Sequence, residues 1–323
     1  MKVAVLVNKA NFEHYTAPGA IPSHWELIHL GNGVPDETVL IATDADALLV
    51  DPMIPISAAV IQGLPRLKLI HSQGVAYNLI DLEAARKAGV YVSNCAGVNA
   101  SAVAEQAILL MLALLRNFRE NEDMVYAARQ KEAKTRCFEN GLKELSDCHV
   151  GIIGLGAIGK ELARMLDAFG CKLSYYSRTT KPECSISYLP LDDLYAQCDI
   201  ISLHVPVNPE TINFINEEAI NKMKQGALLI NTARGELVDQ EAVCRALRDG
   251  RLGGAGFDTL APEPVQADNP FLALPAEIRR KVALSPHIGG ITAGCFYRSF
   301  EIIWSNMRRV AQGLRPSNIV NGL

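Results

Sequence analysis

The sequence predicts an α/β fold: two Rossmann-like or flavodoxin-like domains, each with a parallel sheet, around a cleft. Two observations predict this fold. Short apolar strands alternate with helices along most of the chain. A glycine-rich turn between a strand and an amphipathic helix opens the second half. A chain of 323 residues has room for about two domains of ordinary size.

The first part of the chain forms a βαβ series of its own. Strands are expected at residues 3–7, 47–50, 67–71 and 90–93, and helices at residues 36–43, 57–62 and 81–87. Because this series precedes the glycine turn, we expect it to form a separate parallel sheet. Residues 11–33 are rich in Pro, Gly and His and show no periodicity, so we expect a loop there.

Two helices connect this series to the second one. The first, at about residues 100–118, starts after Asn99 as its N-cap. Its apolar stripe runs through Val103, Ala107, Leu110 and Leu114, which indicates packing against a domain or an oligomer partner. A more polar helix is expected at residues 120–131. Further strands are expected at residues 149–153, 172–176, 199–203, 227–231, 254–257 and 282–284, with helices at residues 240–249 and 293–312.

The glycine turn reads Gly154-Leu155-Gly156-Ala157-Ile158-Gly159. Gly154 permits a tight turn, Gly156 lets a pyrophosphate approach the backbone, and Gly159 lets the next helix pack closely on the sheet. Phosphate groups would bind the free N–H groups at the helix N-terminus, around Ala157 and Ile158. The helix has an apolar stripe at Ile158, Leu162, Met165, Leu166 and Phe169. The pattern predicts a dinucleotide site, and the alternative is a glycine-rich turn without a ligand.

The composition is typical of a globular α/β enzyme, with 49% hydrophobic and 20% charged residues. The net charge of −4 gives no indication of a nucleic-acid partner. The longest apolar run, residues 107–115, is too short to span a bilayer, and the amino-terminal residues lack a signal-peptide pattern. We therefore expect a cytoplasmic protein with no membrane partner.

The eight cysteines show no CxxC spacing and indicate reduced, mostly buried thiols. The nearest histidine pair, His24 and His29, lacks the i,i+4 spacing and a nearby cysteine. We therefore expect no metal site.

The strand at residues 172–176 is followed by Ser177-Arg178-Thr179-Thr180-Lys181. In the dinucleotide fold, an acidic residue about 20 residues past the glycine turn binds the ribose 2′-hydroxyl of NAD. None lies between Asp167 and Glu183. An arginine beside hydroxyl groups would bind a 2′-phosphate, so Ser177, Arg178 and Thr179 favour NADP over NAD. In the alternative, Arg178 stacks on adenine and Ser177 binds the 2′-hydroxyl, and the protein accepts both cofactors.

Three later stretches belong together: Asn231-Thr232-Ala233-Arg234-Gly235-Glu236, Phe257-Asp258-Thr259-Leu260-Ala261-Pro262-Glu263-Pro264 and Ser285-Pro286-His287-Ile288-Gly289-Gly290. With Val103-Ala104-Glu105, Leu203-His204-Val205-Pro206 and Pro209-Glu210-Thr211, the sequence resembles the D-2-hydroxyacid dehydrogenase family over nearly its whole length. These are NAD(P)-dependent enzymes of the glyoxylate/hydroxypyruvate reductase and phosphoglycerate dehydrogenase type.

The resemblance implies a catalytic set of three residues. Arg234 would bind the substrate carboxylate with two hydrogen bonds and polarise the ketone. His287 would be the acid/base. Glu263 would orient His287 and favour its protonated form. Asp258 resembles the aspartate that holds the nicotinamide carboxamide. Further cofactor contacts are implied at Val103, His204, Val205, Pro206, Thr211, Thr232, Ala233 and Gly289.

The resemblance also implies a division of the chain. Residues 1–100 and 291–323 would form the substrate and catalytic domain, and residues 101–290 the NAD(P)-binding domain, which forms homodimers. The substrate would also meet the backbone of Gly74, Val75 and Ala76. The family commonly has glycine at the position of Ala76, where a Cβ restricts φ and narrows the approach to the backbone. Ile291 also fills a position often held by a smaller residue.

We therefore expect reversible reduction of a small 2-oxo acid, with glyoxylate or hydroxypyruvate as first candidates, to the D-2-hydroxy acid. Closure of the domains would exclude water. The alternative is a nucleotide-sensing corepressor of the same fold, which can retain the three catalytic residues. The absence of long disordered tails favours the enzyme.

Overall fold

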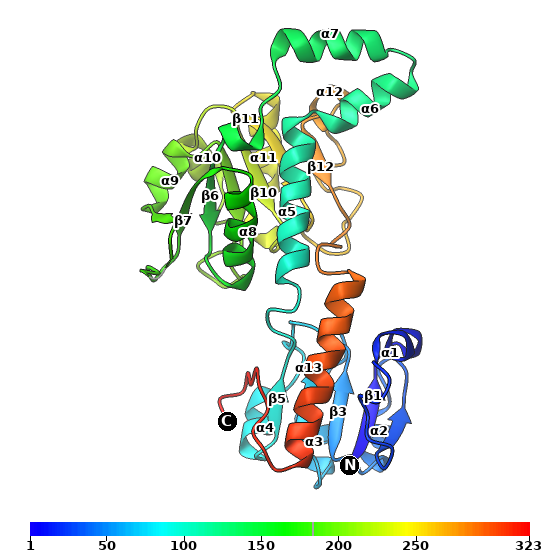
Figure 1. Ribbon diagram of the computed structural model, residues 1–323. Helices are drawn as coiled ribbons and strands as arrows, with labels where there is room; N and C mark the ends of the chain where they lie inside the picture. The colour runs from blue at the N-terminus through cyan, green and yellow to red at the C-terminus, as the bar shows by residue number, and fades with distance from the viewer. Residues whose placement is uncertain (183) are drawn as a thin grey trace. The chain divides into compact units, whose positions relative to one another are not determined.

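A computed structural model describes residues 1–182 and 184–323, so Glu183 lies outside the described residues. The chain divides into two compact units (Figure 1). Unit 1 comprises residues 1–98 and 291–323, and unit 2 comprises residues 99–290. Each unit contains one sheet whose neighbouring strands run parallel. The predicted α/β fold with two parallel-sheet domains is confirmed.

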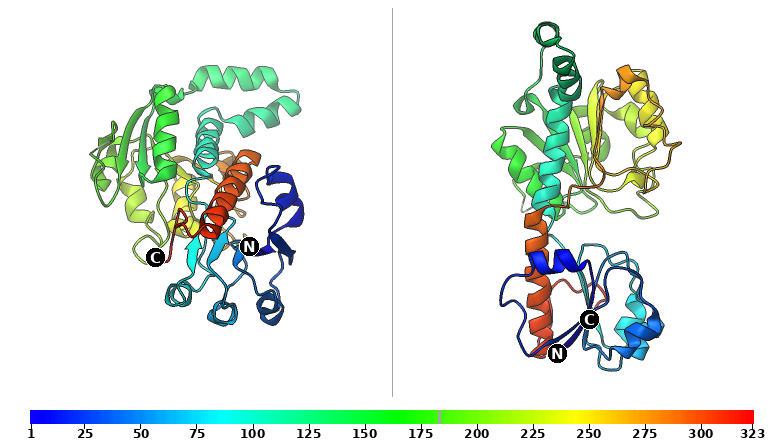
Figure 2. Two further views of the ribbon diagram at one scale, coloured as in Figure 1. Left: turned by 60° about the horizontal axis from the view of Figure 1, so that its bottom comes forward. Right: turned by 90° about the vertical axis from the view of Figure 1, so that its right-hand side faces the viewer.

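Unit 1 is built on a five-stranded sheet in the order β2-β1-β3-β4-β5. The strands are β1 (Lys2–Leu6), β2 (Glu26–His29), β3 (Ala47–Val50), β4 (Leu69–Ser72) and β5 (Tyr91–Ser93). Helices α2 (Glu37–Ala42), α3 (Ala58–Gly63) and α4 (Leu82–Lys87) cover one face, and α1 (Lys9–Tyr15) and α13 (Ala293–Ala311) cover the other (Figure 2). Successive side chains of a strand face opposite sides. In β3, Leu48 and Val50 therefore pack in the core under α2–α4, whereas Ala47 and Leu49 pack in the core under α13.

The expectation of a loop over residues 11–33 is wrong, because this segment contains the end of α1 and the whole of β2. Helix α1 has only seven residues and buries one side chain, that of Phe12. Strand β2 has four residues at the edge of the sheet, and none of them is fully buried. Elements this short carry too few apolar positions for periodicity to reveal them.

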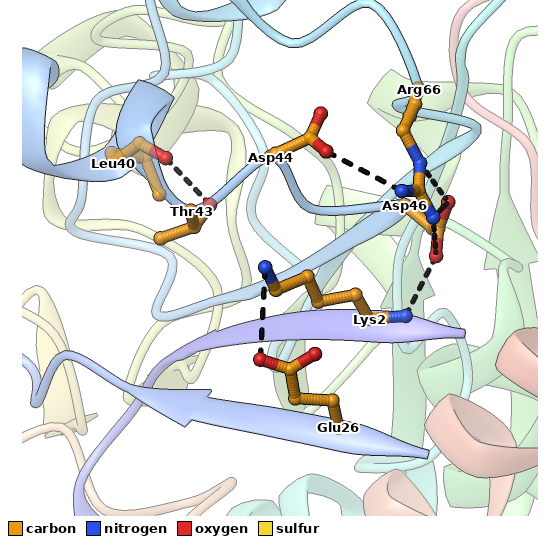
Figure 3. Close-up of polar contacts among 7 residues, drawn as sticks. All are labelled: Lys2, Glu26, Leu40, Thr43, Asp44, Asp46 and Arg66. Atoms are coloured by element: carbon orange, nitrogen blue, oxygen red, sulfur yellow. Dashed lines mark hydrogen bonds and ion pairs between the residues drawn. The ribbon is translucent and has the colours of Figure 1, made fainter. Parts of the chain in front are cut away.

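A polar cluster joins the amino-terminal ends of β1 and β3 (Figure 3). Asp46 accepts hydrogen bonds from the backbone N–H of Lys2 (2.7 Å) and from Nε and Nη2 of Arg66 (3.2 and 3.0 Å). Burial acts to raise the pKa of the Asp46 carboxyl group, but the hydrogen bonds and the charge of Arg66 outweigh it, and the pKa is lowered. Ligands of open parallel sheets bind at the opposite, carboxyl ends of the strands. The cluster lies at the amino-terminal ends, away from that edge, so we assign it to the stability of unit 1 and not to ligand binding.

Unit 2 is built on a seven-stranded sheet in the order β12-β11-β10-β9-β6-β7-β8. The strands are β6 (His149–Ile153), β7 (Lys172–Tyr176), β8 (Ser187–Tyr188), β9 (Ile200–Leu203), β10 (Ala227–Asn231), β11 (Leu252–Phe257) and β12 (Val282–Leu284). Helices α5 (Ala100–Leu115) and α8 (Ala157–Ala168) cover one face, and α9 (Leu191–Gln197), α10 (Glu217–Lys222) and α11 (Gln240–Arg248) cover the other. Short helices lie at Leu145–Asp147, Gly235–Leu237 and, as α12, at Ala276–Arg279.

The connecting helices differ from the prediction. Helix α5 ends at Leu115, and the second predicted helix is two helices, α6 (Phe118–Tyr126) and α7 (Gln130–Asn140), which extend beyond the sheet of unit 2 (Figure 1). Asn117 and Ala128 have positive φ values of 48° and 57°, and a left-handed residue ends a right-handed helix. Asn99 occupies the N-cap position of α5, but its side chain makes no capping hydrogen bond. Phe169, predicted on the apolar stripe of α8, is 44% exposed.

The glycine turn brings α8 very close to β6. Gly154 has a φ of 101°, a value that side chains with a Cβ rarely adopt. At Gly159, an added Cβ would lie 2.1 Å from the carbonyl oxygen of Gly154. The two glycines therefore have the geometric roles that the sequence predicts for them.

All eight cysteines, which lie among the described residues, are free thiols, and five of them are buried. Burial raises the pKa of the Cys95 and Cys198 thiols to about 12. Across residues 1–182 and 184–323, no single helix has both the length and the apolar character needed to cross a membrane. Helices α5 and α6 meet those criteria only as a pair, bent by 61°.

A buried histidine links β4 to α13 in unit 1. Nδ1 of His71 lies 2.9 Å from the carbonyl oxygen of Ser72, and Nε2 lies 3.0 Å from Nδ2 of Asn306. Because a carbonyl only accepts and an amide nitrogen only donates, Nδ1 carries the proton and Nε2 accepts. Burial lowers the pKa of His71 to about 4, so the folded protein keeps this ring neutral near pH 7.

Gly159→Ala should destabilise unit 2, because the backbone must move to accommodate the new Cβ. Overpacking of this kind costs about 1–3 kcal/mol. Gly156→Ala is the matched control, since a Cβ there meets no atom within 4 Å and the backbone is extended (φ −83°, ψ −159°). Thermal unfolding followed by circular dichroism should show a lower Tm for Gly159→Ala alone. Equal Tm values would show that stability does not depend on this close approach.

The free energy of unfolding should fall as the pH is lowered from about 7.5 to about 5. Unfolded chains protonate histidine near the usual pKa of about 6.5, whereas folded His71 takes up a proton only near pH 4. The unfolded state therefore binds the proton first, and His71 contributes about 2 kcal/mol to the fall. Urea titrations should show that His71→Gln lowers the stability more at the higher pH than at the lower one. An equal loss at both pH values would contradict this account.

Candidate active site

Six loops of unit 2 gather at one edge of its sheet. They follow β6, β7, β9, β10, β11 and β12, and the carboxyl ends of parallel strands share one edge. The strand order reverses at β6, which has β7 on one side and β9 on the other. Such a switch point is where open α/β sheets bind ligands. The loops, with the first turn of α8, hold most of the predicted site residues: 154–159, 177–179, 204–206, 211, 232–234, 258, 263 and 287–289. Val103 instead lies in α5, with 5% of its surface exposed.

The turn after β6 leaves room for a phosphate group. Gly156 is the N-cap residue of α8, and no atom lies within 4 Å of the position that its Cβ would occupy. The first N–H groups of a helix have no partner inside the helix and attract anions. At Gly154, an added Cβ would lie 2.5 Å from the carbonyl oxygen of His204, so this turn packs directly against the loop after β9. These features fit the pyrophosphate of a dinucleotide.

In the loops after β9 and β10, two buried polar atoms have no hydrogen-bond partner in the described part of the chain: Nδ1 of His204 and Oγ1 of Thr232. The other ring nitrogen of His204 lies 2.8 Å from Oγ of Ser202, and burial lowers the pKa of His204 to about 4, which keeps the ring neutral. An unpaired buried polar group costs about 1–3 kcal/mol. His204 follows β9, the neighbour of β6, and Thr232 follows β10, the next strand in the sheet, so both lie at the ligand-binding edge and fit the polar contacts of a bound dinucleotide.

The loop after β7 carries the residues predicted to distinguish NADP from NAD. Oγ of Ser177 donates to the carbonyl oxygen of Thr179 (2.6 Å). The guanidinium of Arg178 lies 3.7 Å from the carboxylate of Glu210, and both side chains are 78% exposed. The backbone N–H of Glu210 donates to Oδ1 of Asn208 (2.9 Å), which helps to fix its place. Glu210 comes from the loop after β9, so the residues that directly follow β7 in the sequence give no signal for it.

A buried asparagine fixes the position of Arg234. Oδ1 of Asn231, the last residue of β10, accepts from the N–H of Ala233 (3.0 Å), and Nδ2 donates to the carbonyl oxygen of Arg234 (2.8 Å). Gly235 lets this turn contact the loop after β11, because a Cβ there would lie 2.3 Å from the carbonyl carbon of Leu260. The guanidinium of Arg234 is exposed and uses Nη1 to donate to the carbonyl oxygen of Ala233 (2.8 Å). A planar guanidinium in this position can still offer paired N–H groups to a carboxylate.

His287 and Glu263 form a hydrogen-bonded pair. Nδ1 of His287 lies 2.6 Å from Oε1 of Glu263, and the side chains are 38% and 48% exposed. Because a carboxylate accepts, Nδ1 carries the proton, and Nε2 is the nitrogen left for a ligand. The loop that carries Glu263 is held at the carbonyl oxygen of Ala261, which accepts from Nε2 of Gln240 (2.6 Å) and Nδ2 of Asn269 (3.2 Å).

Asp258 anchors the loop that carries His287. Its carboxylate is almost fully buried, with 2% of the residue exposed. Oδ1 accepts from Oγ of Ser285 (2.5 Å) and the N–H of Ile288 (3.0 Å), and Oδ2 accepts from the N–H of Gly289 (2.8 Å). The main-chain oxygen of Asp258 accepts from the N–H of His287 (2.8 Å). Of the roughly four lone pairs of a carboxylate, this loop therefore uses three.

The predicted substrate loop follows β4 in unit 1. The carbonyl oxygens of Gly74, Val75 and Ala76 accept hydrogen bonds from the Cys95 N–H (2.9 Å), the Asn94 side chain (2.7 Å) and the Ser72 hydroxyl (2.7 Å), respectively. Ala76 is not among the residues with positive φ. Its Cβ therefore puts no left-handed strain on the loop, and the conformation does not require a glycine there.

Comparison with known proteins matches both units. Residues 108–289 match the family model for the D-isomer specific 2-hydroxyacid dehydrogenase, NAD binding domain. The chain is 34% identical to a glyoxylate reductase of Korarchaeum cryptofilum over 308 residues, which cover 93% of this chain and 91% of that protein. It is 36% identical to a glyoxylate reductase of Thermococcus litoralis over 287 residues, which cover 86% of this chain and 84% of that protein.

The solved structure of a D-2-hydroxyisocaproate dehydrogenase has a TM-score of 0.88 to this one at 27% identity, and the likeness covers 100% of both chains. The family model matches more than half of the chain, and the match lies wholly within unit 2. The predicted family is confirmed: the chain belongs to the D-isomer specific 2-hydroxyacid dehydrogenases, oxidoreductases that act on CH–OH groups, and its unit 2 contains their NAD-binding domain.

Proposed function

We propose that the protein reversibly reduces a small 2-oxo acid to the D-2-hydroxy acid, with glyoxylate and hydroxypyruvate as the first candidates. The observation that carries this proposal is the pair of His287 and Glu263, at the same sheet edge as the exposed guanidinium of Arg234. Reduction of a 2-oxo acid needs a hydride, a proton and a group that binds the carboxylate. Relatives named glyoxylate reductase, such as those of Korarchaeum cryptofilum and Thermococcus litoralis, support the choice of substrate.

The proposed catalytic residues divide the proton and charge chemistry between them. The dinucleotide, when bound, supplies the hydride. His287 donates a proton from Nε2 to the carbonyl oxygen and takes it back in the reverse direction. Glu263 holds the ring through Nδ1 and stabilises the imidazolium. Arg234 binds the carboxylate with two hydrogen bonds and polarises the ketone.

We propose that unit 1 is the substrate domain and that its loop of Gly74, Val75 and Ala76 binds the substrate carboxylate through the backbone. The carbonyl oxygens of this loop already accept hydrogen bonds within the unit. The N–H of Gly74 already donates to Oγ of Ser72 (3.3 Å), so the N–H groups of Val75 and Ala76 are the candidate donors to an anion.

We propose that NADP is preferred over NAD. Arg178 is an exposed cation directly after β7, where NAD-specific sites place an acidic residue. The negative charge of its partner Glu210 would repel a 2′-phosphate. Both side chains are largely exposed to solvent, and exposed ion pairs of this kind contribute only about 0–1 kcal/mol. A doubly charged 2′-phosphate can therefore replace Glu210 as the partner of Arg178.

We propose that Asp258 also binds the carboxamide of the cofactor. Its loop uses three of the roughly four lone pairs of the carboxylate, so about one lone pair is left to accept a hydrogen bond from the carboxamide.

We propose a homodimer formed through unit 2. Helices α6 and α7 carry four large exposed apolar side chains: Phe118 (58%), Val125 (54%), Tyr126 (85%) and Phe138 (90%). Contiguous exposed apolar surface marks interaction sites, and an arm that extends beyond its own sheet is free to contact a second copy.

The first experiment measures oxidation of NADPH and NADH by the purified protein with 2-oxo acids from glyoxylate to phenylpyruvate. Turnover with a preferred acid would support the proposal. His287→Asn should then lower kcat by about 10²–10⁴-fold while the dissociation constant of the dinucleotide stays near that of the wild type. Asparagine is the suitable replacement because His287 has a φ of 56°, which asparagine tolerates.

Two outcomes would contradict the proposal. Undiminished turnover by His287→Asn would remove this residue as the acid. Tight dinucleotide binding without turnover of any acid would favour the nucleotide-sensing corepressor.

Arg178→Ala should weaken NADPH about tenfold or more and NADH much less, because a charged hydrogen bond contributes about 1.5–3 kcal/mol. Glu210→Gln is the matched control, and it should change the affinity for NADPH in the opposite direction. Removing the negative charge that lies 3.7 Å from the guanidinium of Arg178 should strengthen NADPH binding roughly threefold to tenfold and leave NADH binding unchanged. Fluorescence titration with each cofactor measures both effects. An equal effect of Arg178→Ala on the two cofactors would rule out the 2′-phosphate assignment.

A further inference from the structure

A chain of hydrogen bonds connects helix α5 to the loop that carries His287. Nε2 of Gln106, in α5, donates to Oγ of Ser285 (2.8 Å). Oγ of Ser285 donates to Oδ1 of Asp258 (2.5 Å). Asp258 in turn accepts the backbone N–H groups of three successive residues, His287, Ile288 and Gly289. All of these residues belong to unit 2.

The loop needs such an anchor because His287 is in an unfavourable conformation. Its φ is 56°, in the left-handed region. A residue with a side chain other than that of Asn or Asp rarely stays there unless its surroundings hold it, and the cost is of order 1–3 kcal/mol. The three N–H contacts to Asp258 hold the residue and its two successors. The direction of the imidazole of His287 therefore depends on the position of Asp258.

The chemistry of the groups allows one arrangement of protons. The carboxylate of Asp258 only accepts, so the hydroxyl proton of Ser285 points toward it. The hydroxyl oxygen is then the acceptor for the amide N–H of Gln106. With its amide reversed, Gln106 would present an oxygen that competes with Asp258 for the single hydroxyl proton. Gln106 thus supports the direction of donation that the carboxylate of Asp258 imposes on Ser285.

Gln106 also limits the loop through packing. An added Cβ at Gly289 would lie 2.9 Å from Oδ2 of Asp258 and 3.4 Å from Cβ and Cγ of Gln106. Gly289 therefore fits closely between the anchor and the helix. Movement of the Gln106 side chain changes the space available to the residue two positions after His287.

We propose that Gln106 and Ser285 are positioning residues that hold Nε2 of His287 in place for proton transfer. Neither is assigned contact with the substrate or the cofactor. The inference rests on the proposed role of His287. It predicts that changes in the chain of hydrogen bonds reduce the rate of the chemical step without loss of ligand binding.

Steady-state kinetics of four variants, with the preferred 2-oxo acid and cofactor, tests this inference. Ser285→Ala removes the donor to Asp258 and should lower kcat roughly tenfold, a change that corresponds to about 1.4 kcal/mol. The KM for the acid and the dissociation constant of the cofactor should change by less than about twofold, because the variant keeps the contacts that bind both ligands in the ground state. Ser285→Thr keeps the hydroxyl and should restore most of kcat.

At the other position, Gln106→Met and Gln106→Glu have nearly the size of the native side chain. Met removes the donor and should lower kcat by a few-fold. Glu replaces the amide donor by a second carboxylate acceptor, so the Ser285 hydroxyl can donate to either residue and no longer to Asp258 alone. It also places a second negative charge near the buried carboxylate of Asp258. Its kcat should therefore fall well below that of Gln106→Met.

Several results would overturn the inference. One is wild-type kcat in Ser285→Ala and Gln106→Glu, while His287→Asn is inactive. A second is a parallel loss of Tm, kcat and cofactor affinity in Ser285→Ala that Ser285→Thr does not restore, which indicates a merely structural role. Undiminished turnover in His287→Asn would instead remove His287 as the acid, and a lack of turnover of any acid by the wild type would refute the proposed function, so these failures can be told apart from a failure of the inference.

Discussion

The buried carboxylate of Asp258 is the interaction on which the candidate active site depends. A charge removed from water costs several kcal/mol unless hydrogen bonds replace its hydration. The Ser285 hydroxyl and the N–H groups of Ile288 and Gly289 supply that replacement. The loop after β12 is therefore held against the end of β11, and the histidine within it lies beside Glu263.

The composition of β11 explains how a helix on one face of the sheet reaches this site. Gly254 and Gly256 present no side chain toward α5: an added Cβ at Gly256 would lie 2.9 Å from Cβ of Leu110, and one at Gly254 would lie 3.2 Å from Cδ2 of Leu114. The helix consequently packs directly on the strand. Such close contact carries its amino-terminal turns, with Gln106, to the end of β11. Packing of small residues thus determines the geometry of a polar site several residues away.

Much of this arrangement could be predicted from the sequence because it depends on local patterns. Alternating strands and helices revealed both parallel sheets, and the order of the glycine turn and later motifs placed their residues at the strand ends. The elements that escaped prediction are those with little local signal. Helix α1 buries one side chain, and the break between α6 and α7 depends on a single left-handed residue, Ala128.

Contacts between distant segments are harder to predict, and Glu210 and Gln106 show two degrees of difficulty. Glu210 reaches Arg178 from a loop two strands away in the sheet, and no spacing along the chain encodes that approach. Gln106 did leave a signal. It lies three residues after Val103 and four before Leu110, so it shares the buried stripe of α5 with apolar neighbours. A polar side chain on a buried helix face must find a partner, and a search for one leads to Ser285, two residues before His287. Interruptions of an apolar stripe are therefore as informative about a site as the motifs that face the ligand.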